Sequence, residues 1–382
     1  MDKGLVLICT FSRADYGKLK STLFLLREKG IPFKIFCAGL HLFHDLGLTW
    51  KEVEKDFPKE IIKSEEQLES SSYQESSILI LNELTKAIDF YNPGLALIHG
   101  DRYESLCAAY TFTLNNVPIA HIEGGEITGT TDEHFRHAIS KLSHFHFVTN
   151  SVSKDVLLRL GEKKQNIHEV GNPSLDILAR IKEENRGLDD VLTRYEIKIS
   201  PKDYVIFLFH PVATVDSTSP ELKIGIDCLD FLLSKNENVI AIRPNLDRNH
   251  ESIYKALDKR ESKLLALIPS MRFELFLQLL YNSKYIVGNS SLLVHEAPFI
   301  GLKAFNIGTR QEGRSTPEST VNIESIHEFK STLESEFMKK NFEGDHFYGS
   351  GKANKEIVKE IEHILDNSHK RTFQKKLTWT DE

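Results

Sequence analysis

Two polar segments contain the residue types that acid–base catalysis needs. The first is His-Gly-Asp-Arg-Tyr-Glu at 99–104, and the second is His-Ile-Glu-Gly-Gly-Glu-Ile-Thr-Gly at 121–129, followed by Asp132 and Arg136. Each segment begins at the end of a short apolar run that predicts a strand. Buried ionised carboxylates are costly unless they are paired, so packing alone explains them poorly. Several carboxylates at one sheet edge would suit proton transfer, with like-charged neighbours raising the pKa of some of them.

Helix capping, together with ion pairing to Arg102 and Arg136, is the structural alternative for these carboxylates. The glycines favour a functional role, because Gly124, Gly125 and Gly129 allow the backbone to approach a ligand closely. We therefore treat the two segments as candidates for acid–base chemistry.

A different chemistry is indicated by the segment Val-Gly-Asn-Ser-Ser-Leu-Leu-Val-His-Glu-Ala-Pro at 287–298. A predicted strand ends at Gly288-Asn289, and Ser290 and Ser291 begin a predicted helix. Small hydroxyl side chains and free amides at a helix N-terminus suit a diphosphate, and Glu296 could accept hydrogen bonds from a ribose diol. A plain helix cap is the alternative. The preceding glycine and the following glutamate favour nucleotide binding.

Three further segments follow predicted strands and carry weaker signals: Thr-Phe-Ser-Arg-Ala-Asp-Tyr-Gly at 10–17, His-Pro-Val at 210–212 and Arg-Pro-Asn-Leu-Asp at 243–247. Arg13 and a helix N-terminus could hold a phosphate, although a capped helix with surface charges explains that segment equally well. A single histidine is more often structural, but the place of His210 at a strand end favours function. The chain has no GxGxxG and no GxxxxGK[ST] motif, so dinucleotide and P-loop binding lack support.

Short apolar strands alternate with amphipathic helices along almost the whole chain. The strands are nearly continuously apolar, as expected for a parallel sheet that helices cover on both faces. In the first half we predict strands at 4–9, 33–37, 95–98, 119–122 and 144–148, and helices at 18–28 and 78–91. In the second half we predict strands at 204–209, 239–242, 264–268, 285–287 and 304–307.

A polar, charged stretch at 182–203 separates the two halves. Two successive arrays of this kind predict an α/β protein with two Rossmann-like, doubly wound domains facing a central cleft. We expect an N-terminal domain over 1–182 that carries the carboxylates and a C-terminal nucleotide-binding domain over 183–354. The amphipathic stretch 355–365 predicts a helix within residues 355–382 that could cross back to the N-terminal domain.

The composition is that of an ordinary globular protein. Of 382 residues, 40% are hydrophobic and 27% are charged, which suits two domains with sizeable cores. The net charge of -7 is spread along the chain, which argues against nucleic acid or an anionic membrane as a partner. There is neither a signal peptide nor a membrane-spanning run of ~20 apolar residues, so we expect a soluble, cytoplasmic protein. The four cysteines have no metal-ligand spacing, and Cys9, Cys37 and Cys107, which lie in or beside apolar runs, are predicted to be buried thiols.

These motifs together resemble the hydrolysing UDP-N-acetylglucosamine 2-epimerases, especially those that feed bacterial sialic acid synthesis. The resemblance runs from residue 4 to about 320, and the combination of motifs is more specific than any one of them. The segments that carry it are SRADYGKLK at 12–20, HGDR at 99–102, HIEGGE at 121–126, RHAISKLSH at 136–144, FHPV at 209–212, IPSMRFELFLQLL at 268–280, VGNSS and EAP within 287–298, and IGTRQEGR at 307–314.

The resemblance implies a fold like that of the GT-B glycosyltransferases, with UDP bound mostly by the C-terminal half. It also implies that UDP-GlcNAc loses UDP by anti elimination across C1–C2 to give 2-acetamidoglucal. Addition of water then yields N-acetylmannosamine. Neither a metal nor a nicotinamide cofactor is implied, and a homodimer through helices of the N-terminal domain is the family expectation.

The resemblance also implies roles for single residues. By motif position the acid–base carboxylates are Asp101, Glu123 and Asp132, taken as a set, and His210 matches the active-site histidine. The positions implied for the nucleotide sugar are Arg13, Ser290 and Ser291 at the diphosphate, Glu296 at the ribose, Ser270 and Phe273 at the uracil, Arg272 along the same site, and Asn245 near the nucleotide and sugar.

One segment departs from the family pattern. Relatives have a segment like PNNDxG, whereas residues 244–248 are Pro-Asn-Leu-Asp-Arg, so Leu246 replaces an amide and Arg248 follows the aspartate. Because this segment is implied to lie near the sugar, the identity of the sugar stays open. The alternative substrates are UDP- or GDP-linked 2,4-diacetamido-2,4,6-trideoxyglucose, used in legionaminic acid synthesis.

Two other protein classes share the predicted fold. A GT-B glycosyltransferase would have the same nucleotide site, but it needs fewer carboxylates in the N-terminal domain and also needs an acceptor groove. A non-catalytic UDP-sugar-binding protein would be expected to have lost carboxylates, and all three are present here. The sequence therefore favours the epimerase interpretation.

Overall fold

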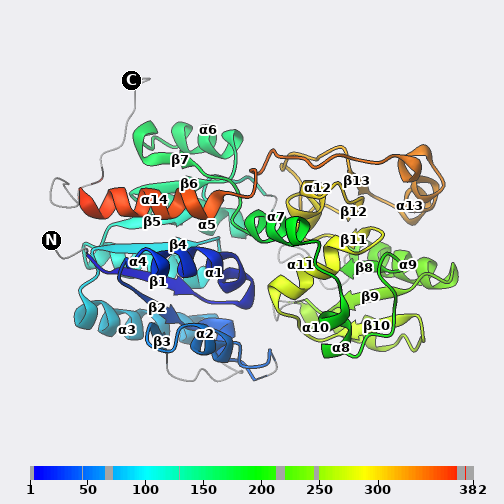
Figure 1. The fold of residues 1–382 in the computed structure, drawn as a ribbon, viewed down its shortest axis with the longest axis horizontal. Helices are drawn as coiled ribbons and strands as arrows, with labels where there is room; N and C mark the ends of the chain where they lie inside the picture. The colour runs from blue at the N-terminus through cyan, green and yellow to red at the C-terminus, as the bar shows by residue number, and fades with distance from the viewer. Residues whose placement is uncertain are drawn as a thin grey trace. The chain divides into compact units, whose positions relative to one another are not determined.

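In the computed structural model (Figure 1), the described residues are 4–44, 46–64, 72–128, 130–211, 220–244, 249–367 and 375. They form two compact units. The first contains 4–127, 132–176 and the C-terminal stretch from 349 onward, and most of the second lies within 177–348. Each unit contains one sheet whose strands are all parallel, and this confirms the predicted α/β fold with two Rossmann-like halves.

The sheet of the first unit has seven strands in the order β3-β2-β1-β4-β5-β6-β7. Its strands are β1 (Val6–Thr10), β2 (Phe33–Cys37), β3 (Ile61–Lys63), β4 (Leu95–His99), β5 (Ile119–Ile122), β6 (Phe145–Val148) and β7 (Ile167–Glu169). Its helices are α1 (Arg13–Glu28), η1 (Gly39–Leu42), α2 (Trp50–Asp56), α3 (Tyr73–Tyr91), α4 (Tyr103–Leu114), α5 (Asp132–Leu142), α6 (Ser151–Arg159), η2 (Lys164–Asn166) and α14 (Ala353–Asp366).

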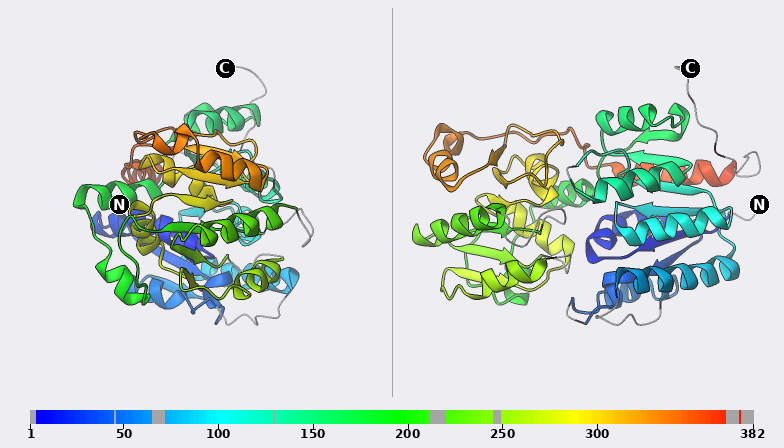
Figure 2. Two further views of the ribbon diagram at one scale, coloured as in Figure 1. Left: turned by 90° about the vertical axis from the view of Figure 1, so that its right-hand side faces the viewer. Right: turned by 180° about the vertical axis from the view of Figure 1, so that it is seen from behind.

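Helix α14, at the end of the described chain, belongs to the first unit. Figure 2 shows this red helix among the blue and cyan elements of that unit. It contacts α1, and its apolar residues Ile357, Val358 and Ile361 share a core with residues of α1 and β1. The second core of the unit lies on the other face of the sheet, where residues of α3, α4 and α5 pack.

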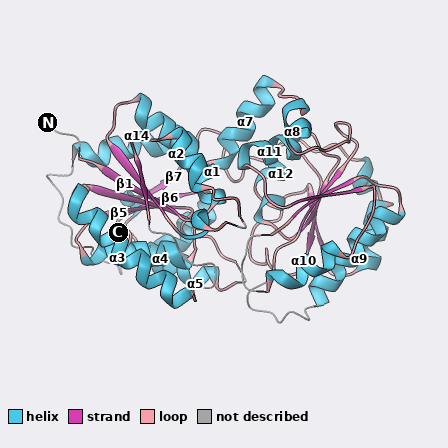
Figure 3. Ribbon diagram, turned by 90° about the horizontal axis from the view of Figure 1, so that it is seen from below, coloured by secondary structure: helices cyan, strands magenta, loops and turns pink. Residues whose placement is uncertain are grey.

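The sheet of the second unit has six strands in the order β10-β9-β8-β11-β12-β13. Its strands are β8 (Val205–Leu208), β9 (Val239–Ile242), β10 (Leu265–Ile268), β11 (Ile286–Gly288), β12 (Ala304–Ile307) and β13 (Thr320–Ile323). Its helices are α8 (Asp189–Arg194), α9 (Pro220–Ser234), α10 (His250–Asp258), α11 (Phe273–Tyr281), η3 (Ser291–Leu293), α12 (Glu296–Phe299), α13 (Ile326–Leu333) and η4 (Glu336–Lys339); α7 (Ser174–Glu184) begins in the first unit and ends in the second. Figure 3 shows helices on both faces of each sheet.

Both sheets have the same topology. In each, the first three strands run outward in one direction, and the chain then returns to the far side of the first strand and continues the other way. The reversal lies between β1 and β4 in the first sheet and between β8 and β11 in the second. Open parallel sheets bind ligands beyond the carboxyl ends of the strands at such a switch point. The topology therefore selects one place in each unit where a site is expected.

The predicted strands 33–37, 119–122, 239–242 and 304–307 are confirmed with the predicted bounds. Three edge strands, β3, β7 and β13, were not predicted, because each is only partly buried and lacks a continuous apolar run. The first helix begins at Arg13 and not at Lys18, since the Ser12 hydroxyl caps it by accepting a hydrogen bond from the Asp15 amide. Among the described residues, no helix is both long and apolar enough to span a membrane.

Gly288 generates a prediction about stability, because a Cβ atom at this position would lie 1.9 Å from the Leu208 carbonyl oxygen. We expect Gly288→Ala to lower the free energy of unfolding by about 2 kcal/mol or more, since backbone would have to move in a buried strand. Gly187→Ala is the matched control, because a Cβ there meets nothing within 4 Å. Urea unfolding followed by circular dichroism measures both variants. Equal, small effects would contradict the packing at the second switch point.

Candidate active site

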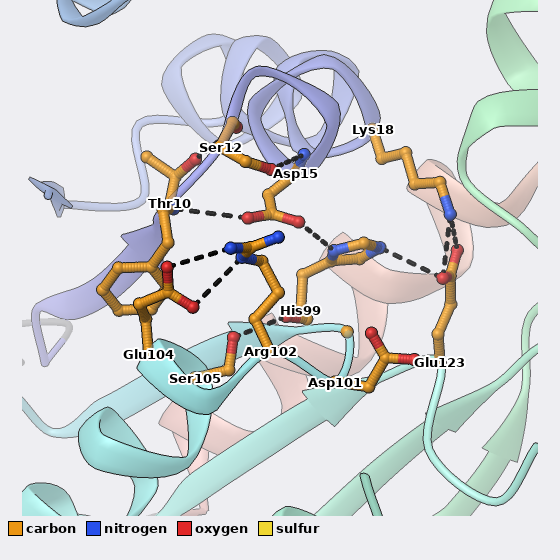
Figure 4. A network of polar contacts seen from close by, with 12 residues as sticks. Thr10, Ser12, Asp15, Lys18, His99, Asp101, Arg102, Glu104, Ser105 and Glu123 are labelled. Carbon is orange, nitrogen blue, oxygen red and sulfur yellow. Dashed lines mark hydrogen bonds and ion pairs between the residues drawn. The ribbon is translucent and has the colours of Figure 1, made fainter. Parts of the chain in front are cut away.

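Figure 4 shows a network of charged side chains at the switch point of the first sheet. Asp15 and Lys18 come from the first turns of α1, which follows β1. His99 is the last residue of β4, and Glu123 comes directly after β5. Since β1, β4 and β5 are neighbours in a parallel sheet, their carboxyl ends bring these residues together.

His99 lies between two carboxylates. Its Nδ1 is 3.5 Å from Asp15 Oδ1, and its Nε2 is 3.3 Å from Glu123 Oε2. The ring is only 5% exposed. Burial alone would lower the pKa of His99, but the charge of Glu123 and the contacts with both carboxylates raise this pKa to about 9. His99 is therefore an imidazolium at neutral pH.

Glu123 has the most constrained position of the three acidic candidates. Lys18 Nζ donates to both of its carboxylate oxygens, at 2.8 and 2.9 Å. The backbone of Glu123 is left-handed, with φ at 66°, and its amide donates to the Phe147 carbonyl at 3.0 Å. A non-glycine residue with such a φ is uncommon and is found disproportionately at functional sites.

The glycines after Glu123 are required by close packing. A Cβ at Gly124 would lie 2.7 Å from Ser140 Oγ, and one at Gly125 would lie 2.3 Å from the Ser153 carbonyl oxygen. Gly125 also has a φ of 82°. These two glycines hold the loop against α5 and α6, so the proposed approach of a ligand is not the only reason for their presence.

Asp101 and Asp132 are linked through Arg136. The side chain of Asp101 forms an ion pair with Arg136, whose guanidinium also donates to the Glu126 carbonyl at 2.8 Å. Arg136 is buried, which by itself would lower its pKa, but Asp101, Glu126 and Asp132 raise the pKa of the guanidinium. Asp132 begins α5 one turn before Arg136. Pairing with arginine, the structural alternative considered for the carboxylates, is therefore present at Asp101.

Two buried histidines near this network are neutral. Burial lowers the pKa of His121 to about 3 and that of His41 to about 4. His121 Nε2 lies 2.8 Å from the Gly100 carbonyl, so this nitrogen carries the proton and Nδ1 accepts from Ser140 Oγ at 3.1 Å. His41 and His121 therefore act as neutral hydrogen-bonding groups beside the charged network.

At the switch point of the second sheet, Asn289 joins the ends of β8 and β11. Its Oδ1 accepts from the His210 amide at 2.7 Å, and its Nδ2 donates to the His210 carbonyl at 2.9 Å. The Asn289 carbonyl in turn accepts from Gln311 Nε2 at 2.8 Å and Arg310 Nη1 at 3.1 Å. The fully buried Asn289 thus fixes the backbone of His210 and the loop after β12.

The prediction that one helix begins at Ser290 and Ser291 is wrong, because this segment forms two separate short elements. Ser290 caps a single 3-10 turn, η3, and the following α12 has four residues beginning with the buried Glu296. Pro298 lacks the amide that a continuous helix would require, which explains the break. A helix this short has little dipole, so a diphosphate here would depend on hydroxyl and single amide groups.

The remaining described residues of the predicted site lie at or just before the starts of α11 and α1. Ser270 and Arg272 lie between β10 and α11, Phe273 begins α11, and the Arg272 amide donates to the Tyr195 hydroxyl at 3.2 Å. Arg13 begins α1 and donates from Nη2 to the Leu46 carbonyl at 3.1 Å. Asn245 lies outside the described residues.

Four residues of the two switch points lie in segments that the sequence singled out but had no role of their own assigned: Asp15, Lys18, His99 and Asn289. Asp15 and Lys18 are three positions apart in a helix, which places both on one face, so their spacing was an available signal. Over the described part of the chain, no group of three or more His, Cys, Asp and Glu residues is arranged to hold a metal ion.

Comparison with known proteins identifies relatives over most of the chain. The sequence profile of the family described as UDP-N-acetylglucosamine 2-epimerase matches residues 25–362. A UDP-N-acetylglucosamine 2-epimerase of Neisseria meningitidis serogroup B is 34% identical over 84% of this chain and 83% of its own length. A GDP/UDP-N,N'-diacetylbacillosamine 2-epimerase (hydrolyzing) of Campylobacter jejuni is 31% identical over 89% of this chain and 90% of its own. The crystal structure of the N. meningitidis UDP-GlcNAc 2-epimerase bound to UDP-GlcNAc has the same fold, with a TM-score of 0.77, 20% identity and coverage of 94% of this chain and 99% of that one.

Proposed function

The chain belongs to the UDP-N-acetylglucosamine 2-epimerase family, and we propose that it is a hydrolysing member that converts UDP-GlcNAc and water into N-acetylmannosamine and UDP. The observation that carries the proposal is the placement of Asp101 and Glu123 after adjacent strands, β4 and β5, beside the first switch point. The name of the 34% identical relative supports the choice of sugar. The product would supply sialic acid synthesis.

The proposed reaction has two stages. A carboxylate removes the proton from C2, the electron pair forms the C1–C2 double bond, and the bond from C1 to the UDP oxygen breaks. Water then adds to the resulting 2-acetamidoglucal, with hydroxyl bonding to C1 and a proton reaching C2 from the opposite face. The sequence of steps inverts C2 and releases UDP, and it requires both a proton acceptor and a proton donor.

We assign these proton transfers to Asp101, Glu123 and Asp132 as a set. A proton acceptor must be ionised near neutral pH, and the cations that contact these carboxylates favour that state. Glu123 contacts Lys18, and Asp101 pairs with Arg136. Carboxylates held in this way on strand ends and at the start of a helix have little freedom to move, which favours catalysis by fixed groups.

We propose roles in nucleotide binding for residues of the second unit and, as the resemblance implies, for Arg13 of the first unit. The roles we propose are Arg13, Ser290 and Ser291 for the diphosphate, Glu296 for the ribose, Ser270 and Phe273 for the uracil, Arg272 along the same site, Asn245 near the sugar, and His210 at the sugar or leaving phosphate. The support is that His210 and Ser290 flank Asn289, which fixes the backbone there.

A second candidate substrate has specific support. The relative from C. jejuni is named for GDP/UDP-N,N'-diacetylbacillosamine. Residues 244–248 of this chain also depart from the expected pattern at the segment implied to lie near the sugar. The same chemistry on a 2,4-diacetamido-trideoxy sugar would supply legionaminic acid synthesis.

A labelling experiment tests the proposed reaction. Purified protein is incubated with UDP-GlcNAc in D2O, without acceptor, and the products are followed by NMR. We expect free UDP and N-acetylmannosamine with deuterium at C2, because the proton added to the glucal comes from solvent. Reaction only with the diacetamido-trideoxy substrate would select the second candidate. UDP release without deuterium at C2 would contradict the elimination, and no release from any of these nucleotides would contradict the proposed function.

Single substitutions test the assignment of the carboxylates. Asp101→Asn and Glu123→Gln should each lower kcat by about a hundredfold or more, because an amide cannot exchange protons with C2. UDP binding measured by calorimetry should change little. Glu83→Gln is the control, because Glu83 pairs with Lys86 on α3, away from the strand ends. A collapse of UDP affinity in the first two variants would make these carboxylates structural.

We also infer a homodimer formed through helices of the first unit in a cytoplasmic protein. Its support is the exposure of apolar side chains on the adjacent helices α3 and α4: Ile78 is 58% exposed, Phe90 81% and Leu114 64%. Exposed apolar groups of this kind often mark an interface. Sedimentation equilibrium should give twice the 43.6 kDa of one chain, and Phe90→Glu combined with Leu114→Glu should give the mass of one chain. A monomeric unmodified protein would contradict the inference.

A further inference from the structure

Three ionisable side chains form a row at the first switch point. Asp15 Oδ1 faces His99 Nδ1 at 3.5 Å, and His99 Nε2 faces Glu123 Oε2 at 3.3 Å (Figure 4). We propose that Asp15 and His99 are positioning residues for the reaction: His99, oriented and charged through Asp15, holds the Glu123 carboxylate ionised and in one direction. This rests on the proposed function, in which Glu123 exchanges a proton with the substrate.

The row is held by rigid elements. The Phe11 amide donates to Asp15 Oδ2 at 3.3 Å, which leaves Oδ1 directed at His99. His99 ends a strand that is buried at every position, and its carbonyl accepts from Ser105 Oγ at 3.2 Å. With its backbone fixed and both ring nitrogens facing carboxylates, the imidazole has one favourable orientation. A carboxylate that contacts this fixed ring is itself held in one orientation.

The chemistry of the contacts requires a charged ring. Carboxylate oxygens only accept hydrogen bonds, so a nitrogen that faces one must carry a proton. Both nitrogens of His99 lie within ion-pair distance of a carboxylate, at 3.5 and 3.3 Å, which favours the doubly protonated ring. Burial alone would lower the pKa of His99, but Glu123 and Asp15 raise it to about 9. Burial alone would raise the pKa of Asp15, whereas His99 and Arg102 lower it. Both groups are thus charged at neutral pH.

Lys18 and His99 act differently on Glu123. Lys18 contacts both carboxylate oxygens, and its side chain is 13% exposed, so it favours ionisation. A four-carbon chain with rotatable bonds can follow the carboxylate as that group moves. The imidazole ring of His99, which is 5% exposed, cannot do so. The direction of the Glu123 carboxylate therefore depends on His99 more than on Lys18.

Two buried histidines near the row stay neutral between neutral pH and pH 9. His41 and His121 have pKa values of about 4 and about 3 because burial disfavours their charged forms. Arg102 donates to both oxygens of Glu104, at 3.1 Å each, and the charge of Arg102 acts on Asp15 at one end of the row. Burial raises the pKa of Glu104. Among the described residues, the charged or titratable groups near the row include Asp15 and Lys18 of α1, His41 of η1, Arg102 and Glu104 at the start of α4, and His121 of β5. The His99→Gln variant therefore decides whether a change in activity near pH 9 belongs to His99.

The test is the pH dependence of kcat and kcat/KM for His99→Gln and Asp15→Asn. In the unmodified protein the imidazolium is intact below its pKa of about 9, so we expect an alkaline decline near pH 9. His99→Gln should remove this decline and move the acid limb upward by about one pH unit, because a buried carboxylate without its cation protonates more easily. It should lower kcat by about tenfold or more while UDP affinity stays nearly unchanged.

Asp15→Asn should move the alkaline decline to lower pH, because one of the two carboxylates that stabilise the imidazolium is gone. His168→Gln is the matched control, since His168 lies on the edge strand β7 and pairs with Glu360 of α14. A histidine that only stabilised the fold would change kcat at all pH values equally. The proposal is overturned if, in both His99→Gln and Asp15→Asn, activity declines at the same acid and alkaline pH values as in the unmodified protein.

A measurement on the unmodified protein separates this proposal from the proposed function. Histidine labelled with 15N reports the protonation of both ring nitrogens, and the signal of His99 is assigned by its shift in Asp15→Asn even if His99→Gln does not fold. We expect a doubly protonated ring at pH 7.5 that titrates near pH 9. A neutral ring at pH 7.5 overturns the proposal even if the enzyme is active. A charged ring in a protein that turns over no nucleotide sugar would refute only the proposed function.

Discussion

Four charged side chains, Asp15, Lys18, His99 and Glu123, lie at the switch point of the first sheet with little contact with water. Two are negative and two are positive, so the group is neutral as a whole although each member is costly to bury alone. The alternation of charges is what allows an ionised carboxylate to lie at this position. Removing one member would leave the group with an uncompensated buried charge, so the site depends on the complete set.

The second unit has the same sheet topology, but the groups at its switch point are different. There the strand ends are joined by a neutral amide, Asn289, which bonds to both the amide and the carbonyl of His210. Gly288, directly before it, allows the strand to approach Leu208 where any side chain would collide. One sheet order thus supports a charged site in the first unit and a site of backbone and amide groups in the second. The first suits proton transfer, and the second suits binding of a polar ligand by fixed hydrogen-bonding groups.

Much of the fold could be predicted because buried parallel strands leave a clear pattern. The strands at 119–122 and 239–242 are apolar at every or nearly every position, and their bounds were predicted correctly. The edge strand β13 is buried only at its first and last residues and was missed. The helix expected after Ser290 was wrong in kind, because Pro298 interrupts the amides of that segment. Local patterns therefore predict elements that are buried on both faces better than they predict edges and short turns.

For the site, the sequence by itself indicated which segments could carry chemistry: the acidic residues Asp101 and Glu123 follow predicted strands, and two glycines come directly after Glu123. Only the tertiary structure decided which of these groups touch, because Asp15, His99 and Glu123 come from three strand ends that are distant in the chain. Parallel pairing of β1 with β4 and of β4 with β5 aligns those ends. The charge of a buried group depends on its neighbours in space, so the imidazolium state of His99 exists only once the sheet has assembled.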